Sequence, residues 1–149
     1  MRLQHWGFAA LLAAVPATAK APGLHVEGWA RAGVSSSAAY VTVHNRKTSG
    51  DRLLGASSPA ARSVTIHNSA MQGGVMRMRL AGALAVPAGG SIAMKPGGLH
   101  VMLTGLRAPL RPGTRLPLTL RFERAGNVPV SLPVLPPGAT GPRDPHHGH

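Results

Sequence analysis

The sequence contains no cysteine, and this absence excludes several kinds of protein. No disulfide can hold the domain together, and a blue-copper electron carrier would need a thiolate that the chain lacks. Aromatic residues are also scarce, because only Trp29, Tyr40 and Phe122 follow residue 19. With so few rings on which bases could stack, and with basic residues dispersed along the chain, nucleic acid is not expected as a partner.

Acidic residues are few as well. The chain has 4 Asp and Glu against 16 Lys and Arg, a formal net charge of +12. Glu27, Asp51, Glu123 and Asp144 show no spacing typical of a carboxylate pair, and no nucleophile-elbow, phosphate-loop or HExxH motif is present. We therefore expect a protein that is not an enzyme. Its charge favours acidic protein faces or anionic lipid headgroups as partners, or simply a basic soluble protein.

No apolar run is long enough to cross a bilayer, so the protein is not expected to span a membrane. Residues 1–19 instead have the features of a secretory signal. Arg2 supplies a positive start, residues 6–15 are apolar, and Ala17-Thr18-Ala19 is an A-x-A cleavage site. We expect export, with the mature chain beginning near Lys20 and carrying a side-chain charge of +11 once Arg2 is removed (15 minus 4).

The remainder of the chain has the pattern of an all-β protein, without a long helical period. Short runs of β-forming residues alternate with Gly, Pro, Ser and Asn clusters. They predict nine strands, at residues 24–30, 38–45, 52–56, 63–67, 75–80, 91–95, 99–103, 115–123 and 128–134. Such a pattern predicts one domain, a Greek-key sandwich or barrel over residues 20–134. Pro117, Pro129 and Pro133 lie within these runs, so their strands are expected to be edges or bulged.

Two histidines and several methionines are concentrated between residues 67 and 102. His67, Met78, His100 and Met102 form the pattern H-x10-M-x21-H-x-M. Imidazole binds several late transition metals, but thioether sulfur is soft and selects Cu(I) over zinc, calcium or magnesium. Copper is therefore the first hypothesis, although each Met or His taken alone could be an ordinary core residue.

Strand periodicity gives this pattern a geometric basis. Side chains separated by one residue share a face of a strand, so His100 and Met102 are expected to lie side by side. The same rule places Met76 and Met78 on one face of their strand, with Arg77 and Arg79 on the opposite, solvated face. Met71 and Met76 are possible secondary contacts of the metal that shield it.

The four-residue pattern resembles the signature of the periplasmic copper chaperones called PCu(A)C, with no gap. The resemblance covers most of the chain from about residue 24 to 134. It includes the segments VEGWARAG (26–33), AAYVTVHN (38–45), DRLLGASSPAA (51–61), GGVMRMR (73–79), PAGG (87–90), KPGGLHVML (95–103) and PLTLRFERAG (117–126). One departure is Asn68, where the family often has methionine.

This resemblance implies a cupredoxin-like fold and a periplasmic chaperone that binds Cu(I) through His67, Met78, His100 and Met102. It points to the CuA centre of cytochrome c oxidase, or another copper chaperone, as the acceptor, and so to a role in oxidase assembly and copper homeostasis. Two alternatives remain open. One is a periplasmic protein that stores or scavenges copper, and the other is a secreted β-sandwich that binds an anionic partner without metal.

Residues outside the main pattern carry further expectations. Residues 135–149 are expected to form a disordered tail, whose His146, His147 and His149 could add a weaker Cu(II) site. His25 and His44 each lie alone in a predicted strand and are interpreted as structural or surface residues. Met94 and Trp29 are interpreted as core residues.

Overall fold

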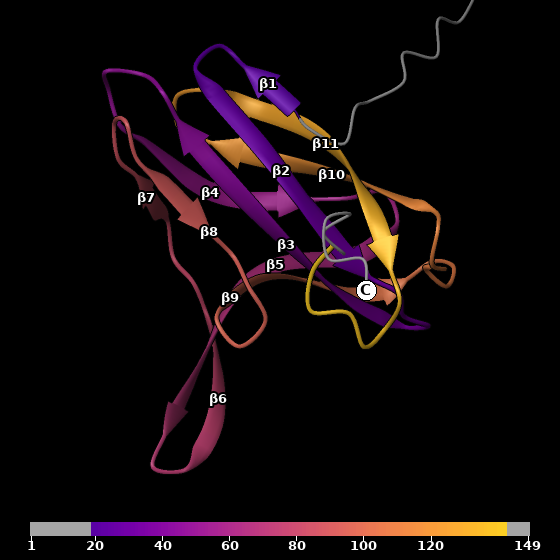
Figure 1. Cartoon of the computed structure of the whole chain (residues 1–149). Coiled ribbons are helices and arrows are strands. Elements are labelled where there is room, and N and C mark those ends of the chain that lie inside the picture. The colour runs from indigo at the N-terminus through magenta and orange to yellow at the C-terminus, as the bar shows by residue number, and fades with distance from the viewer. Residues whose placement is uncertain (1–18, 143–149) are drawn as a thin grey trace, which may run out of the picture.

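The computed structural model describes residues 19–142, and within them the fold is built from strands (Figure 1). The eleven strands among these residues are β1 (Ala19–Ala21), β2 (Leu24–Arg31), β3 (Ser36–Asn45), β4 (Asp51–Ser57), β5 (Ala61–Gln72), β6 (Val75–Leu80), β7 (Leu84–Val86), β8 (Ser91–Ala93), β9 (Leu99–Leu106), β10 (Arg115–Phe122) and β11 (Gly126–Leu135). This part of the chain contains no helix long and apolar enough to cross a membrane. The predicted all-β class is confirmed.

Hydrogen-bonded neighbours follow the order β6-β5-β9-β3-β2-β11-β10-β4-β7, with β1 added to β2 and β8 added to β3. The path folds over into two layers, because β2 and β11 join only through a short parallel pairing of Ala30 and Arg31 with Val134 and Leu135. One layer holds β2, β3, β9 and β5, and the other holds β11, β10 and β4 (Figure 1). Strands β4 and β5 are not hydrogen-bonded to each other, so the sandwich is open at this seam.

The core lies between the two layers and is formed by alternate residues of each strand. In β10, Leu116, Leu118 and Leu120 are buried while the residues between them are more exposed. Val26, Val41, Val43, Val101 and Leu103 line the facing layer. The opposite side of that layer, which we call the outer face, therefore carries the alternate residues of β2, β3, β9 and β5.

A two-residue turn joins β5 to β6 into a hairpin that extends away from the sandwich (Figure 1). Gly73 and Gly74 both have positive φ, 58° and 78°. Positive φ at both central positions is the requirement of a type I′ turn, which glycine meets without strain. The turn sets the register of the hairpin, in which Met78 lies opposite Ser69 and Met76 opposite Met71.

The side chain of Asp51 joins two parts of the second layer, the start of β4 and the turn between β10 and β11. Its buried carboxylate accepts hydrogen bonds from the backbone N–H groups of Arg52, Arg124 and Ala125 at 2.8, 2.9 and 3.0 Å, and from Lys47 Nζ at 3.3 Å. Burial works to raise the pKa of Asp51, but these hydrogen bonds outweigh it and hold the pKa below its ordinary value. The ionised carboxylate thus fixes the start of β4 to the turn between β10 and β11.

Each of the nine predicted strands is present, and two short ones, β1 and β7, were not predicted. The proline-containing strands were expected to be edges or bulged. Strands β10 and β11 lie inside the strand order and are not edges, but the pairing of β10 with β4 shifts register between Arg121 and Phe122, as at a β-bulge. The prolines of β10 and β11 lie in segments that pair with one neighbouring strand instead of two. Pro117 precedes the segment of β10 that pairs with β4, and Pro129 and Pro133 precede the two residues of β11 that pair with β2. A missing N–H is tolerated there because no partner strand needs it.

The first residues of the predicted tail lie against the fold. Leu135 is the last residue of β11, and Ala139 closes a turn with a hydrogen bond from its N–H to the carbonyl of Pro136. Arg31 Nε donates to the carbonyl oxygen of Ala139 at 3.0 Å. Residues 143–149, which include the three tail histidines, lie outside the described residues, as do residues 1–18 of the predicted signal.

Candidate metal centre

Three adjacent strands, β6, β5 and β9, bring the four predicted ligands to the outer face. His67 on β5 lies directly opposite His100 on β9, and Met102 on β9 lies opposite Thr65. Met78 on β6 lies opposite Ser69, two residues beyond His67. Directly opposed residues of antiparallel strands share a face, and so do residues two apart on one strand. The register therefore places all four side chains on the same face of the sheet.

His100 is buried, with 5% of its surface exposed, and its ring is held in one orientation. Its Nδ1 lies 3.0 Å from the carbonyl oxygen of Gly98. A carbonyl only accepts, so Nδ1 carries the proton and Nε2 has a free lone pair. This Nε2 is buried and has no hydrogen-bond partner among the described residues. An unsatisfied buried acceptor is unfavourable in a folded protein, and metal ligation would satisfy it.

His67 has a similar arrangement. Its Nε2 lies 3.1 Å from the hydroxyl of Thr65, and its Nδ1 is buried without a hydrogen-bond partner among the described side chains. When Nε2–H donates to the hydroxyl, Nδ1 carries the lone pair that a metal needs. The two rings are nearly perpendicular, at 79°, with centroids 5.9 Å apart. The sequence prediction did not include Thr65, although its position two residues before His67 on one strand was a signal for the contact.

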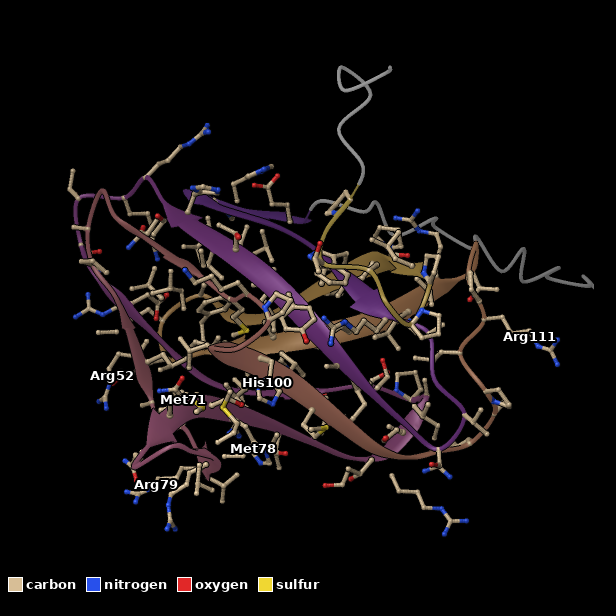
Figure 2. All side chains as sticks on the ribbon, turned by 60° about the horizontal axis from the view of Figure 1, so that its bottom comes forward. Arg52, Met71, Met78, Arg79, His100 and Arg111 are labelled. Carbon is tan, nitrogen blue, oxygen red and sulfur yellow. The ribbon has the colours of Figure 1, made fainter. Side chains whose placement is uncertain are left out.

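The methionines form the solvent-facing side of the site. Met78 is 49% exposed, and Met102 is partly buried. The predicted secondary residues Met71 and Met76 are also exposed and oppose each other near the hairpin turn, on the same face as Met78. Figure 2 shows Met71, Met78 and Arg79 on the β5–β6 hairpin and His100 on β9. The exposed thioether of Met78, beside the buried His100 and the partly buried His67, leaves the candidate site open to solvent on one side.

A row of rings continues across the outer face from the histidines. Tyr40 lies 6.5 Å from His100 and 4.6 Å from Trp29, measured between ring centroids. Arg31 covers both, with its guanidinium carbon 5.4 Å from the Tyr40 ring and 5.9 Å from the Trp29 ring. Trp29 and Met94 are buried as predicted, but both border a recess of this outer face. These rings border the candidate site on the side of His100.

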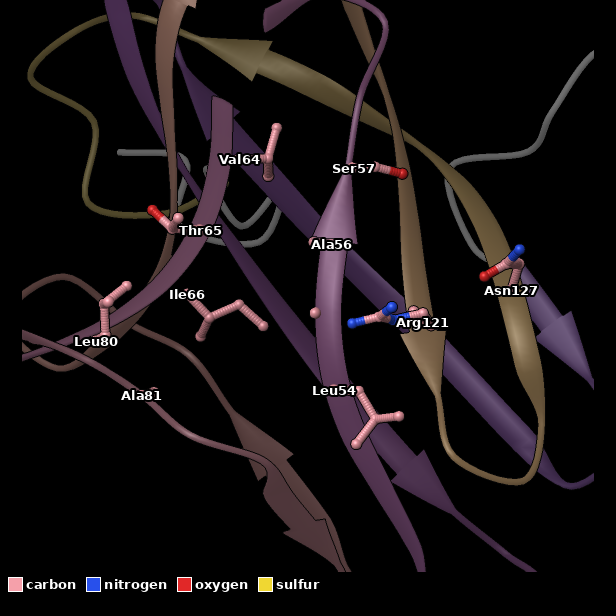
Figure 3. Close-up of a pocket in the computed structure, with 11 residues that line it drawn as sticks. Leu54, Ala56, Ser57, Val64, Thr65, Ile66, Leu80, Ala81, Arg121 and Asn127 are labelled. Carbon is pink, nitrogen blue, oxygen red and sulfur yellow. The ribbon is translucent and has the colours of Figure 1, made fainter. Parts of the chain in front are cut away.

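A groove lies at the open seam between β4 and β5 (Figure 3). It has a volume of about 440 Å³ and is lined by Leu54, Ile66, Leu80 and Arg121 among others. None of the four predicted ligands lines it. Thr65, whose hydroxyl contacts His67, is among the lining residues, so the groove borders the candidate metal centre without including a ligand.

Three basic residues, Arg77, Arg79 and Arg107, differ in their position relative to this centre. Arg77 and Arg79 alternate with Met76 and Met78 along β6 and so occupy the opposite face of the hairpin. Arg107 follows the end of β9, seven residues from His100, which corresponds to about 20 Å along a strand.

The fold and the ligand set define a small cupredoxin-like β-sandwich with a candidate soft-metal centre on one sheet. The family described as "Putative lipoprotein LpqE-like" matches residues 13–134, and the chain belongs to it. A relative, "Putative lipoprotein Lxx21020" of Leifsonia xyli subsp. xyli (strain CTCB07), is 35% identical over 128 residues, which cover 80% of this chain and 77% of the relative.

Solved structures give the same assignment at the level of fold. The apo PCuAC domain of PmoF2 is 29% identical, with a TM-score of 0.67 over 84% of this chain and 99% of that domain. The copper-bound PCuAC domain of PmoF2 has the same identity and TM-score over 80% of this chain and 98% of that domain. Apo-DR1885 from Deinococcus radiodurans is 28% identical, with a TM-score of 0.61 over 95% of this chain and 97% of that protein. The predicted resemblance to PCu(A)C proteins is confirmed.

Proposed function

We propose that this protein binds Cu(I) through His67, Met78, His100 and Met102 and delivers the ion to an acceptor protein. The observation that carries the proposal is the pair of buried ring nitrogens without hydrogen-bond partners, His67 Nδ1 and His100 Nε2, beside two thioethers on one sheet face. The similarity to a copper-bound PCuAC domain and to the CuI form of DR1885 supports copper as the metal.

The ligand chemistry suits transport. Two imidazoles and two thioethers are neutral, so bound Cu(I) keeps its single positive charge. Thioethers select Cu(I), but a thiolate is a stronger ligand for it. An acceptor with cysteine sulfur, such as the CuA centre of cytochrome c oxidase, would therefore take the ion in the thermodynamically favourable direction. The exposed thioether side of the site gives such an acceptor direct access.

Export places both partners in one compartment. The apolar segment at residues 6–15 and the A-x-A site at 17–19 support a signal peptide and a periplasmic location. The word lipoprotein in the descriptions of the family and of the Leifsonia xyli relative also supports an exported protein. The acceptor would then meet a protein whose net charge is strongly positive.

The tail histidines His146, His147 and His149 are proposed as a weaker Cu(II) site. Imidazole binds Cu(II) well, but the closing of a chain segment around an ion costs conformational entropy and lowers the affinity. A chain that ends at Leu135 should therefore keep its Cu(I) binding and lose an equivalent of Cu(II).

An anaerobic Cu(I) titration against a competing chelator tests the main site. We expect one tightly bound ion, and an affinity about tenfold lower or more in Met78→Leu and in Met102→Leu, since leucine keeps the volume and removes the sulfur. Met94→Leu is the matched control, because Met94 is buried and is not one of the four proposed ligands. Unchanged affinity in both ligand variants would overturn the proposed site.

Transfer distinguishes delivery from the alternatives. The Cu(I)-loaded protein is mixed with a reduced, copper-free CuA domain, the two are separated, and the metal on each is assayed. Copper on the CuA domain supports delivery. Copper that stays wholly on this protein, with a competent acceptor, supports storage or scavenging instead. A protein that binds no Cu(I) would be the secreted sandwich without a metal role.

A further inference from the structure

Two further histidines and a glutamate lie together on the outer face, away from the candidate copper site. His25 on β2 lies directly opposite His44 on β3, with ring centroids 5.8 Å apart. Glu27 is two residues beyond His25 on β2 and shares its face. His44 Nε2 lies 3.3 Å from Glu27 Oε1, and His25 Nε2 lies 3.9 Å from Glu27 Oε2. The sequence interpretation treated the two histidines as isolated, but the register pairs them.

This cluster repeats the backbone arrangement of the candidate copper site. There, His67 opposes His100 across two antiparallel strands, and Met102 follows His100 by two residues. Here, His44 opposes His25, and Glu27 follows His25 by two residues. The ring separations agree, at 5.9 and 5.8 Å. The difference between the two sets is chemical, because a carboxylate replaces the thioether.

The distances between the ligand atoms are close to those that a metal needs. Two ligand atoms bound to one ion at about 2.0–2.2 Å lie roughly 2.9–3.6 Å apart for tetragonal or tetrahedral angles. The contact of His44 with Glu27 falls in this range, and that of His25 exceeds it by a few tenths of an ångström. No three such side chains of the described residues already surround one point, so His25 must turn. The side chains of His25, His44 and Glu27 are 24%, 38% and 53% exposed, which leaves them room to do so.

The charges around Glu27 also favour a cation. In a chain with 16 Lys and Arg, Asp51 is paired with Lys47, and Glu123 with Arg52. Glu27 differs from these two carboxylates, because the ionic contacts found for it among the described side chains are with the two histidines. When the histidines are neutral, no cation among residues 19–142 lies within ion-pair distance of its negative charge.

We propose that His25, Glu27 and His44 form a second metal site, selective for divalent transition metals and tightest for Cu(II). Two imidazoles and a carboxylate lack the soft sulfur that holds Cu(I), and nitrogen and oxygen ligands follow the order in which Cu(II) binds more tightly than Zn(II). This site goes beyond the proposed function and does not depend on it. The outer face would then hold Cu(I) at one end and Cu(II) at the other.

The test is a Cu(II) titration of the full chain, followed by electron paramagnetic resonance of the bound ion. Pro142 borders the same recess as Glu27, so tail histidines could contribute. The titration is therefore repeated on a chain with His146, His147 and His149 replaced by Asn. In both backgrounds we expect His25→Gln/His44→Gln to lose one equivalent of Cu(II), and Glu27→Gln to lower affinity about tenfold while keeping both imidazoles.

Controls separate this site from the proposed Cu(I) site and from misfolding. Met78→Leu/Met102→Leu should keep the Cu(II) equivalent, and His25→Gln/His44→Gln should keep its Cu(I) affinity and its circular dichroism spectrum. An unchanged Cu(II) stoichiometry and spectrum in His25→Gln/His44→Gln, or an unchanged affinity in Glu27→Gln, would overturn the proposal. Zn(II) bound more tightly than Cu(II) would overturn its selectivity.

Discussion

His67 and His100 face each other across β5 and β9, with ring centroids 5.9 Å apart and ring planes at 79°. Each ring uses one nitrogen in a short contact, with Thr65 Oγ1 or with the Gly98 carbonyl, and leaves the other nitrogen buried without a hydrogen-bond partner. Both rings are thus oriented before any metal arrives, which reduces the entropy lost on binding. The orienting contacts are as informative as the ligands and can be tested separately.

Removal of the Thr65 hydroxyl should weaken the metal site without removing a ligand. In Thr65→Val the ring of His67 loses its Nε2 partner, so the tautomer with a free Nδ1 is no longer favoured. We expect Cu(I) affinity to fall about tenfold, as is typical when the partner of a ligating histidine is lost. Chelator competition measures the effect. Thr65→Ser, which restores the hydroxyl, should recover most of the affinity; equal losses in both variants would contradict this role.

The turn of the β5–β6 hairpin should control the position of Met78. Replacement of Gly73 and Gly74 by valine places β-branched residues at two positive-φ positions, which strains the turn and shifts the register. Because the hairpin extends from the sandwich and β6 is exposed throughout, we expect Cu(I) affinity to fall while the thermal midpoint changes little. Gly113→Val, at a positive φ in a loop far from the ligands in sequence, is the control. A large drop in the midpoint together with unchanged affinity would refute this account.

Arg79 should affect copper transfer, and Arg107 should not. Arg79 is on the hairpin that carries Met78, whereas Arg107 lies beyond the far end of β9. If the acceptor approaches the exposed thioethers with an acidic face, Arg79→Ser should slow transfer by a few-fold at low salt, and less at high salt. Stopped-flow mixing with the CuA domain at two ionic strengths measures this effect. Equal slowing by Arg107→Ser would point to net charge instead of local docking.

Asp51 should make stability depend on pH in the acid range. Its folded-state pKa lies below the unfolded value of about 3.9, so its contribution is complete above that value and is lost as the pH falls through the folded pKa. Asp51→Asn should lower the unfolding free energy at pH 7 by about 2 kcal/mol, because the charged acceptor of four hydrogen bonds is lost. Urea titrations between about pH 2 and 7 should show the difference from wild type shrinking below pH 4. A difference that stays constant over this range would disprove the linkage.

The local alternation of apolar and polar residues was sufficient to predict most of the strands. Leu116, Leu118 and Leu120 alternate with polar residues in the sequence and point into the core in the structure, because the period of two is a property of the strand itself. The same rule placed Met76 and Met78 on one face of β6, and His100 beside Met102 on β9. Short strands such as β7, at Leu84–Val86, were not predicted, since three residues carry too little periodicity.

Only the tertiary structure shows which strands pair with one another. Pro117 and Pro129 suggested edge or bulged strands. Strands β10 and β11 lie inside the order, and the prolines occupy segments with one free side. His25 and His44 are 19 residues apart in the sequence and were interpreted separately, but the β2–β3 register makes them neighbours. No periodicity within one strand encodes its register with another.

The sequence by itself determined the chemistry of the proposed site: two imidazoles and two soft thioethers in a chain without thiols, spaced so that strand alternation pairs them. What the tertiary structure decided is their convergence, because the β6-β5-β9 pairing brings residues 67, 78, 100 and 102 to one face. It also decided that Thr65 and Gly98 orient the two rings and that His25, Glu27 and His44 form a second cluster. The physical reason is that side-chain alternation is local, whereas hydrogen-bond register between strands depends on how the whole sheet packs over its core.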